Sequence, residues 1–456
     1  MPRLVRSRRT RRRQAARRVG LFAGTMMVVG GIIGSGIFLN PSVVAQRAGT
    51  AGLTIAAWLL GGGVAVLGAF IYAELGGRRP EAGGGYVYLR DAFGPLPAFL
   101  YAWTLLLVIA TGAIAAVAMT FASYAAAVVG LPRTVITPMA LASIVLLTLI
   151  NVLGVKPSSV MTSLFTLLKL AALGILILAG LAAIVGARLP APVLLPLVNG
   201  TATVSFAGAL VPVLFAYGGW QQTNFVAEEM VDASHNLPRA LLWGVGIVLV
   251  VYLLANIVYL KVLGVGGLAD SSAPAADTMQ LLFGPAGRTF IAVGIALSTI
   301  GFLNLAICAN ARVYQAMARD RIFFDAFARL HPRFRTPVVA LVAQGAWAIV
   351  LVLSGTYGEL LDYVVFGDWI FFGLTAATLF YFRRRDALAG TARPEFVTPA
   401  WQLSVILFVA AAIYVVAGSV IASPGNALRG AALILLGVPL YLWRRRAGLE
   451  RGSGNG

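Results

Sequence analysis

The stretch GTMMVVGGIIGSGIFLN, residues 24–40, lies in the first long apolar segment of the chain and carries glycines where a membrane helix would run unbroken. Four glycines fall between residues 30 and 36, with Ser35 between the last two. Glycine destabilises a helix interior, and backbone groups that leave a helix find no water in a lipid bilayer. The pattern therefore predicts a broken helix whose backbone groups bind a small zwitterion or an ion in a buried cavity.

Composition places the chain in the membrane. Of its 456 residues, 59% are apolar and only 11% are charged, whereas a soluble protein carries about 25% charged residues. The apolar runs predict an all-α polytopic membrane protein with twelve transmembrane helices, each near or above the roughly 17–20 residues that a bilayer requires. The predicted spans are residues 20–47, 53–77, 94–129, 134–154, 158–185, 203–230, 240–264, 286–317, 337–354, 358–381, 400–422 and 428–443.

The distribution of basic residues predicts the orientation. With the N-terminus inside, 28 of the 35 basic residues fall on the inner side, 6 fall on the outer side and Lys169 lies within a span. This asymmetry predicts a multi-pass protein of the cell membrane with both termini in the cytoplasm. The net charge of +19 and the basic arm 1–19 therefore indicate an anchor on anionic lipid rather than nucleic-acid binding or a transit peptide.

A second glycine-broken span repeats the first. Span 6 reads VPVLFAYGGWQQTNFVAEEM (residues 211–230), with Gly218-Gly219 at its centre. The two broken spans lie five spans apart, which inverts their topology and predicts two inverted repeats around a central binding site. The predicted organisation is a basic arm 1–19, a first repeat 20–200, a second repeat 201–385, helices 11 and 12 over 386–446, and a flexible tail 447–456.

Several motifs in this order resemble the amino acid–polyamine–organocation superfamily, and within it most the bacterial L-type and related neutral amino acid permeases. They are GGIIGSGIF (30–38), PEAGGGYVYLRDAFGPLPAFLYAW (80–103), FAYGGWQQTNFVAEEM (215–230), NLPRA (236–240), ARVYQAMARDR (311–321) and FGDWIFFGLTAATLF (366–380). The resemblance implies a LeuT-type five-plus-five fold and a transporter that works by alternating access. It implies neither enzymatic activity nor a cofactor.

The first break is expected to bind a carboxylate. The amides of Gly34, Ser35 and Gly36 would begin the second half of span 1, where free N–H groups and the helix dipole favour an anion. The resemblance implies the same role for these positions. The alternative is that the glycines serve close helix packing, since Gly30 and Gly34 also fit a helix-contact motif.

The opposite helix ends are expected to bind an ammonium group. The first half of span 1 ends at Ile32 and Ile33 with free carbonyls. Span 6 would add the carbonyls of Phe215, Ala216 and Gly218. The carboxylate of an amino acid would thus meet amides at a helix N-terminus, and its ammonium would meet carbonyls at helix C-termini.

The side-chain pocket is expected to draw on spans 1, 3, 6, 8 and 10. Span 3 contributes TGAIAAVAM (111–119), which is small and apolar, and spans 1 and 3 hold no acid for a cationic side chain. This favours neutral L-amino acids. Phe215 and Tyr217 flank the second break, and the resemblance implies that an aromatic at the Phe215 position caps the substrate from outside. The alternative is ordinary aromatic packing.

Lys169 is a charge near mid-membrane, about 20 Å along span 5. A charge at this depth is by default functional. In sodium-driven relatives a cation lies between spans 1 and 8; here an ammonium would replace it, bonding carbonyls of Ile33 or Gly34 and hydroxyls of Ser298 or Thr299. This predicts sodium-independent transport, by exchange or proton symport. The alternatives are that Lys169 carries a proton or extends to the interface.

Three further carboxylates are candidates. Asp368 in span 10 either lines the cavity, takes part in proton coupling, or caps a helix near a break. Glu228 and Glu229 end span 6 and form either an inner gate or a solvated helix end. The partners expected for such a gate are Arg78, Arg79 and Arg239.

Other residues limit the remaining possibilities. His235 and His331 fall in loops without nearby ligands, so no metal site is predicted. The sole cysteine, Cys308, lies in span 8. The resemblance implies that heteromeric relatives bond an ancillary glycoprotein through a cysteine of the outer loop 130–133; this loop has none, so no disulfide-linked ancillary subunit is expected. The alternatives to a neutral amino acid transporter are a non-transporting amino acid sensor and a permease for polyamines or cationic amino acids. An intramembrane protease or a channel fits the sequence less well.

Overall fold

The computed structural model of the protein describes residues 19–81, 83–154, 159–186, 206–225, 227–354, 357–390, 394–422 and 424–453. Across these ranges the chain is helical, and an isolated parallel bridge between Val19 and Met230 is its one piece of β-structure. The basic arm before Val19 lies outside the described residues. The predicted all-α class is confirmed.

The helices follow one another with short connections. The first half of the chain forms α2 (Leu21–Ile32), α3 (Gly36–Ala48), α4 (Ala51–Arg78), α5 (Gly85–Phe93), α6 (Pro95–Thr104), the π-helical turn η1 (Leu105–Ile109), α7 (Ala110–Val129), the 3₁₀ turn η2 (Arg133–Val135), α8 (Ile136–Val152) and α9 (Ser159–Val185). The second half forms α10 (Phe206–Ala216), α11 (Gln222–Phe225), the 3₁₀ turn η3 (Ala227–Glu229), α12 (Ala233–Asp270), α13 (Pro274–Arg319), the 3₁₀ turn η4 (Asp325–Ala328), α14 (Val338–Ser354), α15 (Tyr357–Ala389), α16 (Trp401–Ala422) and α17 (Pro424–Ser453).

Within the described ranges, eight helices are long and apolar enough to cross a membrane, or nine when the bent pair α2–α3 is taken as one span. This confirms a polytopic membrane protein. It is fewer than the twelve predicted spans because α8, α10 and α14 are apolar but short, and they occupy the places predicted for spans 4, 6 and 9.

The outer surface of the bundle is apolar. Large side chains such as Leu146 on α8, Leu178 on α9 and Ile413 on α16 are more than half exposed, at 56%, 69% and 65%. A soluble monomer rarely exposes such continuous apolar surface, whereas hydrocarbon chains cover it without cost. The surface therefore fits a lipid environment.

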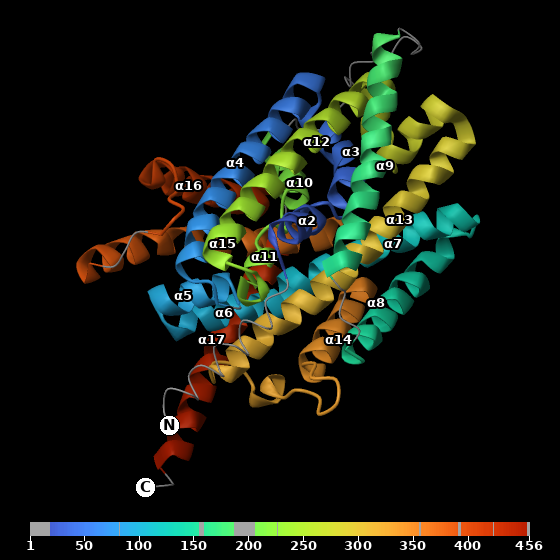
Figure 1. The fold of residues 1–456 in the computed structure, drawn as a ribbon. Coiled ribbons are helices and arrows are strands. Elements are labelled where there is room, and N and C mark those ends of the chain that lie inside the picture. The colour runs from blue at the N-terminus through green and yellow to red at the C-terminus, as the bar shows by residue number, and fades with distance from the viewer. Residues whose placement is uncertain are drawn as a thin grey trace.

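The two predicted breaks are present and lie at the centre of the bundle (Figure 1). Residues 33–35 separate α2 from α3, and the two helices bend by 41°. Residues 217–221 separate α10 from the short α11. α12 packs against α2, α3 and α4, while α13 packs against α7 and α9, so the breaks are enclosed by long helices.

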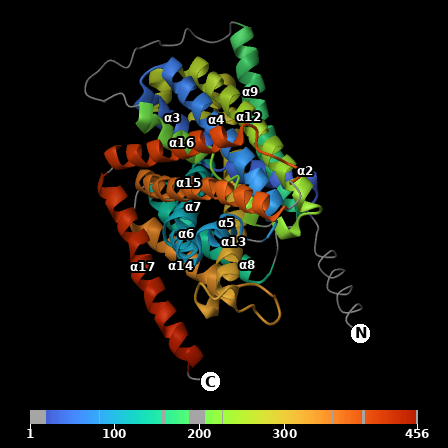
Figure 2. The same cartoon turned by 90° about the vertical axis from the view of Figure 1, so that its left-hand side faces the viewer.

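The last two helices lie at the periphery. α16 packs against α15 and α10, and α17 runs along the outside of the bundle (Figure 2). α17 continues to Ser453 and so includes most of the segment expected to be a flexible tail. α12 and α13 also extend beyond their predicted spans, across kinks at Gly264 and Gly284, where φ is +71° and +67°.

Candidate functional site

The two breaks touch each other backbone to backbone. A Cβ added at Gly219 would lie 2.0 Å from the Gly31 carbonyl oxygen, and φ at Gly219 is +107°. A Cβ at Gly36 would lie 2.6 Å from Ala216 Cα. Only glycine allows both approaches. The close-packing interpretation of these glycines therefore applies, and the packing itself brings the ends of α2, α3 and α10 to one place.

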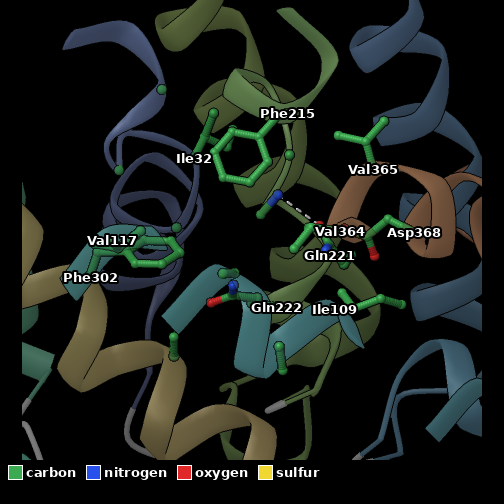
Figure 3. Close-up of a pocket in the computed structure, with 18 of the residues that line it drawn as sticks. Ile32, Ile109, Val117, Phe215, Gln221, Gln222, Phe302, Val364, Val365 and Asp368 are labelled. Atoms are coloured by element: carbon green, nitrogen blue, oxygen red, sulfur yellow. Dashed lines mark hydrogen bonds between the residues drawn. The ribbon is translucent and has the colours of Figure 1, made fainter. Parts of the chain in front are cut away.

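A cavity with about 730 Å³ of empty space surrounds this contact (Figure 3). Its walls come from the five segments that the sequence predicted, namely α2–α3, η1–α7, α10–α11, α13 and α15. The π-helical turn η1 places Leu105 and Ile109 in the wall. Such turns are frequent at functional sites because they shift the register of a helix by one residue.

Most of the predicted backbone site lines this cavity. The lining residues among the predicted set are Ile32, Gly34, Ser35, Gly36, Phe215 and Gly218. Phe215 is half-buried and its ring stands over the cavity in Figure 3. Ala216 and Tyr217 do not line it. The Tyr217 ring is buried behind the second break, with its centroid 5.7 Å from that of Trp58 and 5.1 Å from that of Tyr252, so its predicted position as a gate is not supported.

Protein donors occupy several of the carbonyls that were predicted to be free. The Tyr252 hydroxyl lies 3.2 Å from both the Ile32 and the Ala216 carbonyl oxygens. The Gly34 amide donates to the Ile32 carbonyl at 2.8 Å, and the Gly218 amide donates to the Phe215 carbonyl at 3.0 Å. A hydroxyl has a single proton to donate. Tyr252 therefore satisfies only one of its two acceptors at a time.

Lys169 braces the first break from α9. Its ammonium donates to the Ile33 carbonyl at 2.8 Å and to the Gly30 carbonyl at 3.2 Å. The acceptor beside Ile33 is thus Gly30 instead of the predicted Gly34. The side chain is 2% exposed and faces a crevice separate from the cavity, next to Thr166 and Gly301. It reaches neither the interface nor the large cavity.

The two hydroxyls predicted to assist Lys169 do not do so. Thr299 donates to Ile295 and Ala296 of its own helix, at 2.8 and 3.0 Å. Ser298 is buried, and its hydroxyl has no hydrogen-bond partner among the described residues. Their predicted bonds to the ammonium were therefore wrong in this conformation.

Asp368 lines the cavity, which was one of its three predicted roles. α15 continues through this position, so the carboxylate does not cap a helix break. The side chain is half-buried, and Figure 3 shows it beside Val364 in the cavity wall. Asp368 is thus an ionisable side chain inside the predicted side-chain pocket.

Neither glutamate of span 6 meets the arginines predicted for it. Glu229 pairs with Arg312 on α13 at 2.9 Å, and Glu228 is exposed. Arg78 pairs with Glu74 at 2.7 Å and also with Asp386. The tertiary fold decided these partners, since Arg312 of α13 reaches Glu229 while Arg78 pairs with Glu74 of its own helix. In the described ranges no three His, Cys, Asp or Glu side chains gather into a metal site.

Comparison with known proteins identifies the family. A model of the amino acid permease family matches residues 19–438. The chain belongs to the amino acid permease family. This permease is 33% identical over 446 residues to the Asc-type amino acid transporter 1 of Homo sapiens, covering 94% of this chain and 83% of that protein. The predicted superfamily is confirmed, and permeases are not enzymes.

Two other relatives are similar to this permease over most of its length. The b(0,+)-type amino acid transporter 1 of Oryctolagus cuniculus is 33% identical over 379 residues, which are 80% of this chain and 76% of that protein. The large neutral amino acids transporter small subunit 2 of Homo sapiens is 31% identical over 435 residues, which are 93% of this chain and 79% of that protein. All three relatives are named as amino acid transporters, and one of the names specifies large neutral amino acids.

The permease places further side chains in the cavity that were not predicted as site residues. Gln221 and Gln222 follow the second break directly, and α13 contributes Phe302 and Asn310. The signal for Asn310 was available, because Phe302 and Asn310 lie eight residues apart on one helical face and a polar residue on such a face is rare in a membrane span. The contact between Phe302 and Gly34 required the fold.

Proposed function

We propose that this permease moves neutral L-amino acids across the cell membrane by alternating access. Transport is independent of sodium and runs as exchange or as proton-coupled symport. The observation that carries the proposal is the cavity between the two helix breaks, because the end of α2, the start of α3 and the end of α10 meet there.

The helix ends match the two charged groups of an amino acid. The first amides of α3 have no acceptor within their own helix, and the dipole of α3 favours a carboxylate beside Gly34, Ser35 and Gly36. At the opposite helix ends, the Ile32 and Ala216 carbonyls share one hydroxyl proton from Tyr252. The Ile32 carbonyl lines the cavity and accepts the Gly34 amide with one lone pair, so a substrate ammonium would donate to its second lone pair in place of Tyr252.

The cavity walls favour a neutral side chain. Leu105, Ile109 and Val117 form an apolar wall with Phe302 and Val365. Pockets lined mostly by apolar groups with a few polar ones bind neutral ligands of matching shape. Phe215 would close over the bound substrate, as the half-buried ring above the cavity suggests.

Lys169 supports independence from sodium. Its ammonium, 2.8 Å from the Ile33 carbonyl, provides at the first break the positive charge that a bound cation would otherwise provide. A sodium ion bound beside this buried ammonium would be repelled by it, so the first break has no place for sodium.

For the topology, we propose twelve spans in two inverted five-span repeats, followed by α16 and α17. The short helices α8 and α14 and the broken pair α10–α11 then count as spans. Both termini lie in the cytoplasm of the cell. At that face, the Glu229–Arg312 pair joins η3 to α13, and Val19 donates its amide to the Glu229 carbonyl at 3.1 Å, which supports an inner gate there.

The chain is proposed to work without a disulfide-linked partner. Its sole cysteine, Cys308, lies on α13 at an inner cavity beside Arg312 and Gln315, away from the outer loop 130–133. No thiol is therefore available on the predicted outer face.

Counterflow in proteoliposomes tests the proposal. Purified permease loaded with unlabelled alanine should accumulate labelled alanine, serine or leucine in sodium-free buffer, whereas liposomes without protein should not. A pH gradient that drives uptake without internal substrate would identify symport, and its failure with retained counterflow would identify exchange. Strict dependence on sodium would refute the role of Lys169.

One observation favours a second candidate function. Asp368 places a carboxylate in the cavity, which a cationic amino acid or a polyamine could bind. Preferential counterflow of lysine or a diamine over alanine would replace the neutral proposal. Binding of an amino acid, measured as a rise in thermal stability, without any counterflow would identify a sensor instead.

A further inference from the structure

The cavity wall carries an acidic side chain, that of Asp368. Among the described residues, no hydrogen bond or ion pair engages the half-buried Asp368 carboxylate. It lies on α15, in the wall that also holds Val364 and Val365 (Figure 3). Because an unpaired charge at membrane depth is costly, an occupant of the cavity that donates a hydrogen bond would be stabilised at this place.

Gln221 presents the complementary group to the same cavity. Its Oε1 accepts the Gly219 amide at 2.9 Å, which fixes the orientation of the carboxamide by the second break. Its Nε2 has no acceptor among the described residues. Gln221 and Asp368 line one cavity, and they lie on the same side of it in Figure 3. This part of the wall thus offers a charged acceptor and a fixed donor.

We infer that Asp368 and Gln221 together select amino acids whose side chain carries a hydroxyl group. A hydroxyl donates to the carboxylate and accepts from the carboxamide, so it satisfies both groups at once. An ammonium would leave Nε2 without an acceptor, a carboxylate would be repelled by Asp368, and a methyl group would leave both unpaired. The inference rests on the proposed transport function and assigns its side-chain specificity.

The test compares two substrates that differ only in this group. Serine and 2-aminobutyrate have a hydroxyl and a methyl on the same carbon, and alanine has neither. Each is measured as a competitor of labelled alanine in sodium-free counterflow. The wild-type permease should prefer serine to 2-aminobutyrate by about 10-fold to 100-fold, the factor expected for a hydrogen bond to a charged group.

Variants assign the preference to the two residues. In Asp368→Leu, which removes the acceptor at similar volume, the ratio of serine to 2-aminobutyrate competition should fall to about onefold, whatever the rate of alanine counterflow. In Gln221→Glu, the Gly219 amide keeps its acceptor but the donor becomes a second acceptor, so 2,3-diaminopropionate should now compete better than serine. Asp325→Leu removes an exposed carboxylate outside the cavity and should leave the preference unchanged.

Three results would overturn the inference. They are an unchanged serine preference in Asp368→Leu, a wild-type preference for 2,3-diaminopropionate over serine, and equal competition by serine and 2-aminobutyrate in the wild type. If Asp368→Leu does not accumulate in the membrane, Asp368→Asn keeps one acceptor oxygen and should reduce the preference without abolishing it. Absence of alanine counterflow in the wild type would instead refute the proposed function.

Discussion

The two helix breaks have the same glycine-rich sequence character but are stabilised differently. The first break, residues 33–35, is held from outside by Lys169 of α9, which bonds the Gly30 and Ile33 carbonyls. The second break, residues 217–221, is held by its own turn, where the Gly218 amide bonds Phe215 and the Gly219 amide bonds the Gln221 side chain.

The two breaks therefore share the interruption of the helix but not the groups that support it. A break held by a charge from another helix depends on the position of that helix, so it can respond to movement of α9. A break held by its own turn keeps its shape while its surroundings move. The first break is therefore the one expected to report conformational state, and the second the one expected to carry fixed recognition groups.

Substitution at the contact between the two breaks should have the largest effect on stability and transport. Gly219→Ala places a methyl 2.0 Å from the Gly31 carbonyl oxygen in a backbone with φ of +107°. Left-handed backbone and overpacking together should cost roughly 2–5 kcal/mol. Thermal unfolding in detergent should show a large fall in midpoint and loss of transport. Gly63→Ala, where an added Cβ meets open space, is the control and should change neither.

Loss of the charge at the first break should abolish most transport. Lys169→Met leaves the Gly30 and Ile33 carbonyls unpaired, at a cost of about 1–3 kcal/mol each. Alanine counterflow should fall at least about 10-fold while the protein still accumulates in the membrane. Thr166 lies one turn before Lys169 on α9, and its hydroxyl donates to the Met26 carbonyl. Thr166→Val removes this neutral donor and should reduce alanine counterflow much less. Equal activity of both variants would deny Lys169 any special role.

Two neighbouring glycines of the first break should respond differently. Gly36→Ala pushes a methyl to 2.6 Å from Ala216 Cα, so it should disturb the helix contact and lower thermal stability by about 1–3 kcal/mol. Gly34→Ala places its methyl in ordinary contact, 3.5 Å from the Phe302 ring, on the cavity wall. It should keep stability and weaken alanine binding. The two substitutions thus separate the packing role of Gly36 from the binding role of Gly34. If both variants lost thermal stability and alanine binding to the same extent, this separation of roles would be contradicted.

Removal of the Tyr252 hydroxyl should have the smallest effect on stability and on alanine binding. Tyr252→Phe removes the donor that bridges Ile32 and Ala216, and a single hydrogen bond contributes about 0.5–1.5 kcal/mol. Because the ring and its contacts with Trp58 and Tyr217 remain, unfolding should change little. Alanine binding should be retained, since the substrate ammonium can supply the donor. A complete loss of binding would show that the hydroxyl takes part in recognition directly.

The sequence predicted the breaks and Lys169 because each violates a simple rule of membrane helices. Glycines in an apolar run and a lysine at mid-span are costly, so their presence alone is informative. The five spans expected to form the pocket also supply the cavity walls. The sequence could not place Tyr252, whose hydroxyl meets a carbonyl 220 residues away, nor choose between Gly30 and Gly34 as the second acceptor of Lys169.

Helix ends and ion pairs were predicted less well. Hydropathy predicts where a segment is apolar and not where its helix ends. It therefore did not predict that α12 and α13 continue past the kinks at Gly264 and Gly284, since polar residues can also form helices. Arg312 as the partner of Glu229 depends on how α13 lies against η3. Asp368 was recognised as unusual, but its direction into the cavity depends on the rotation of α15, which a single sequence does not specify.

The central claim is that the helix ends at the two breaks hold the two charged groups of an amino acid. It is tested most directly by equilibrium binding of labelled L-alanine to the purified wild-type permease, with competition by L-alanine, L-alaninamide and L-lactate. L-alaninamide lacks the carboxylate and L-lactate lacks the ammonium. The account predicts that only L-alanine displaces the label. Displacement by L-lactate or L-alaninamide at concentrations similar to those of L-alanine would contradict it.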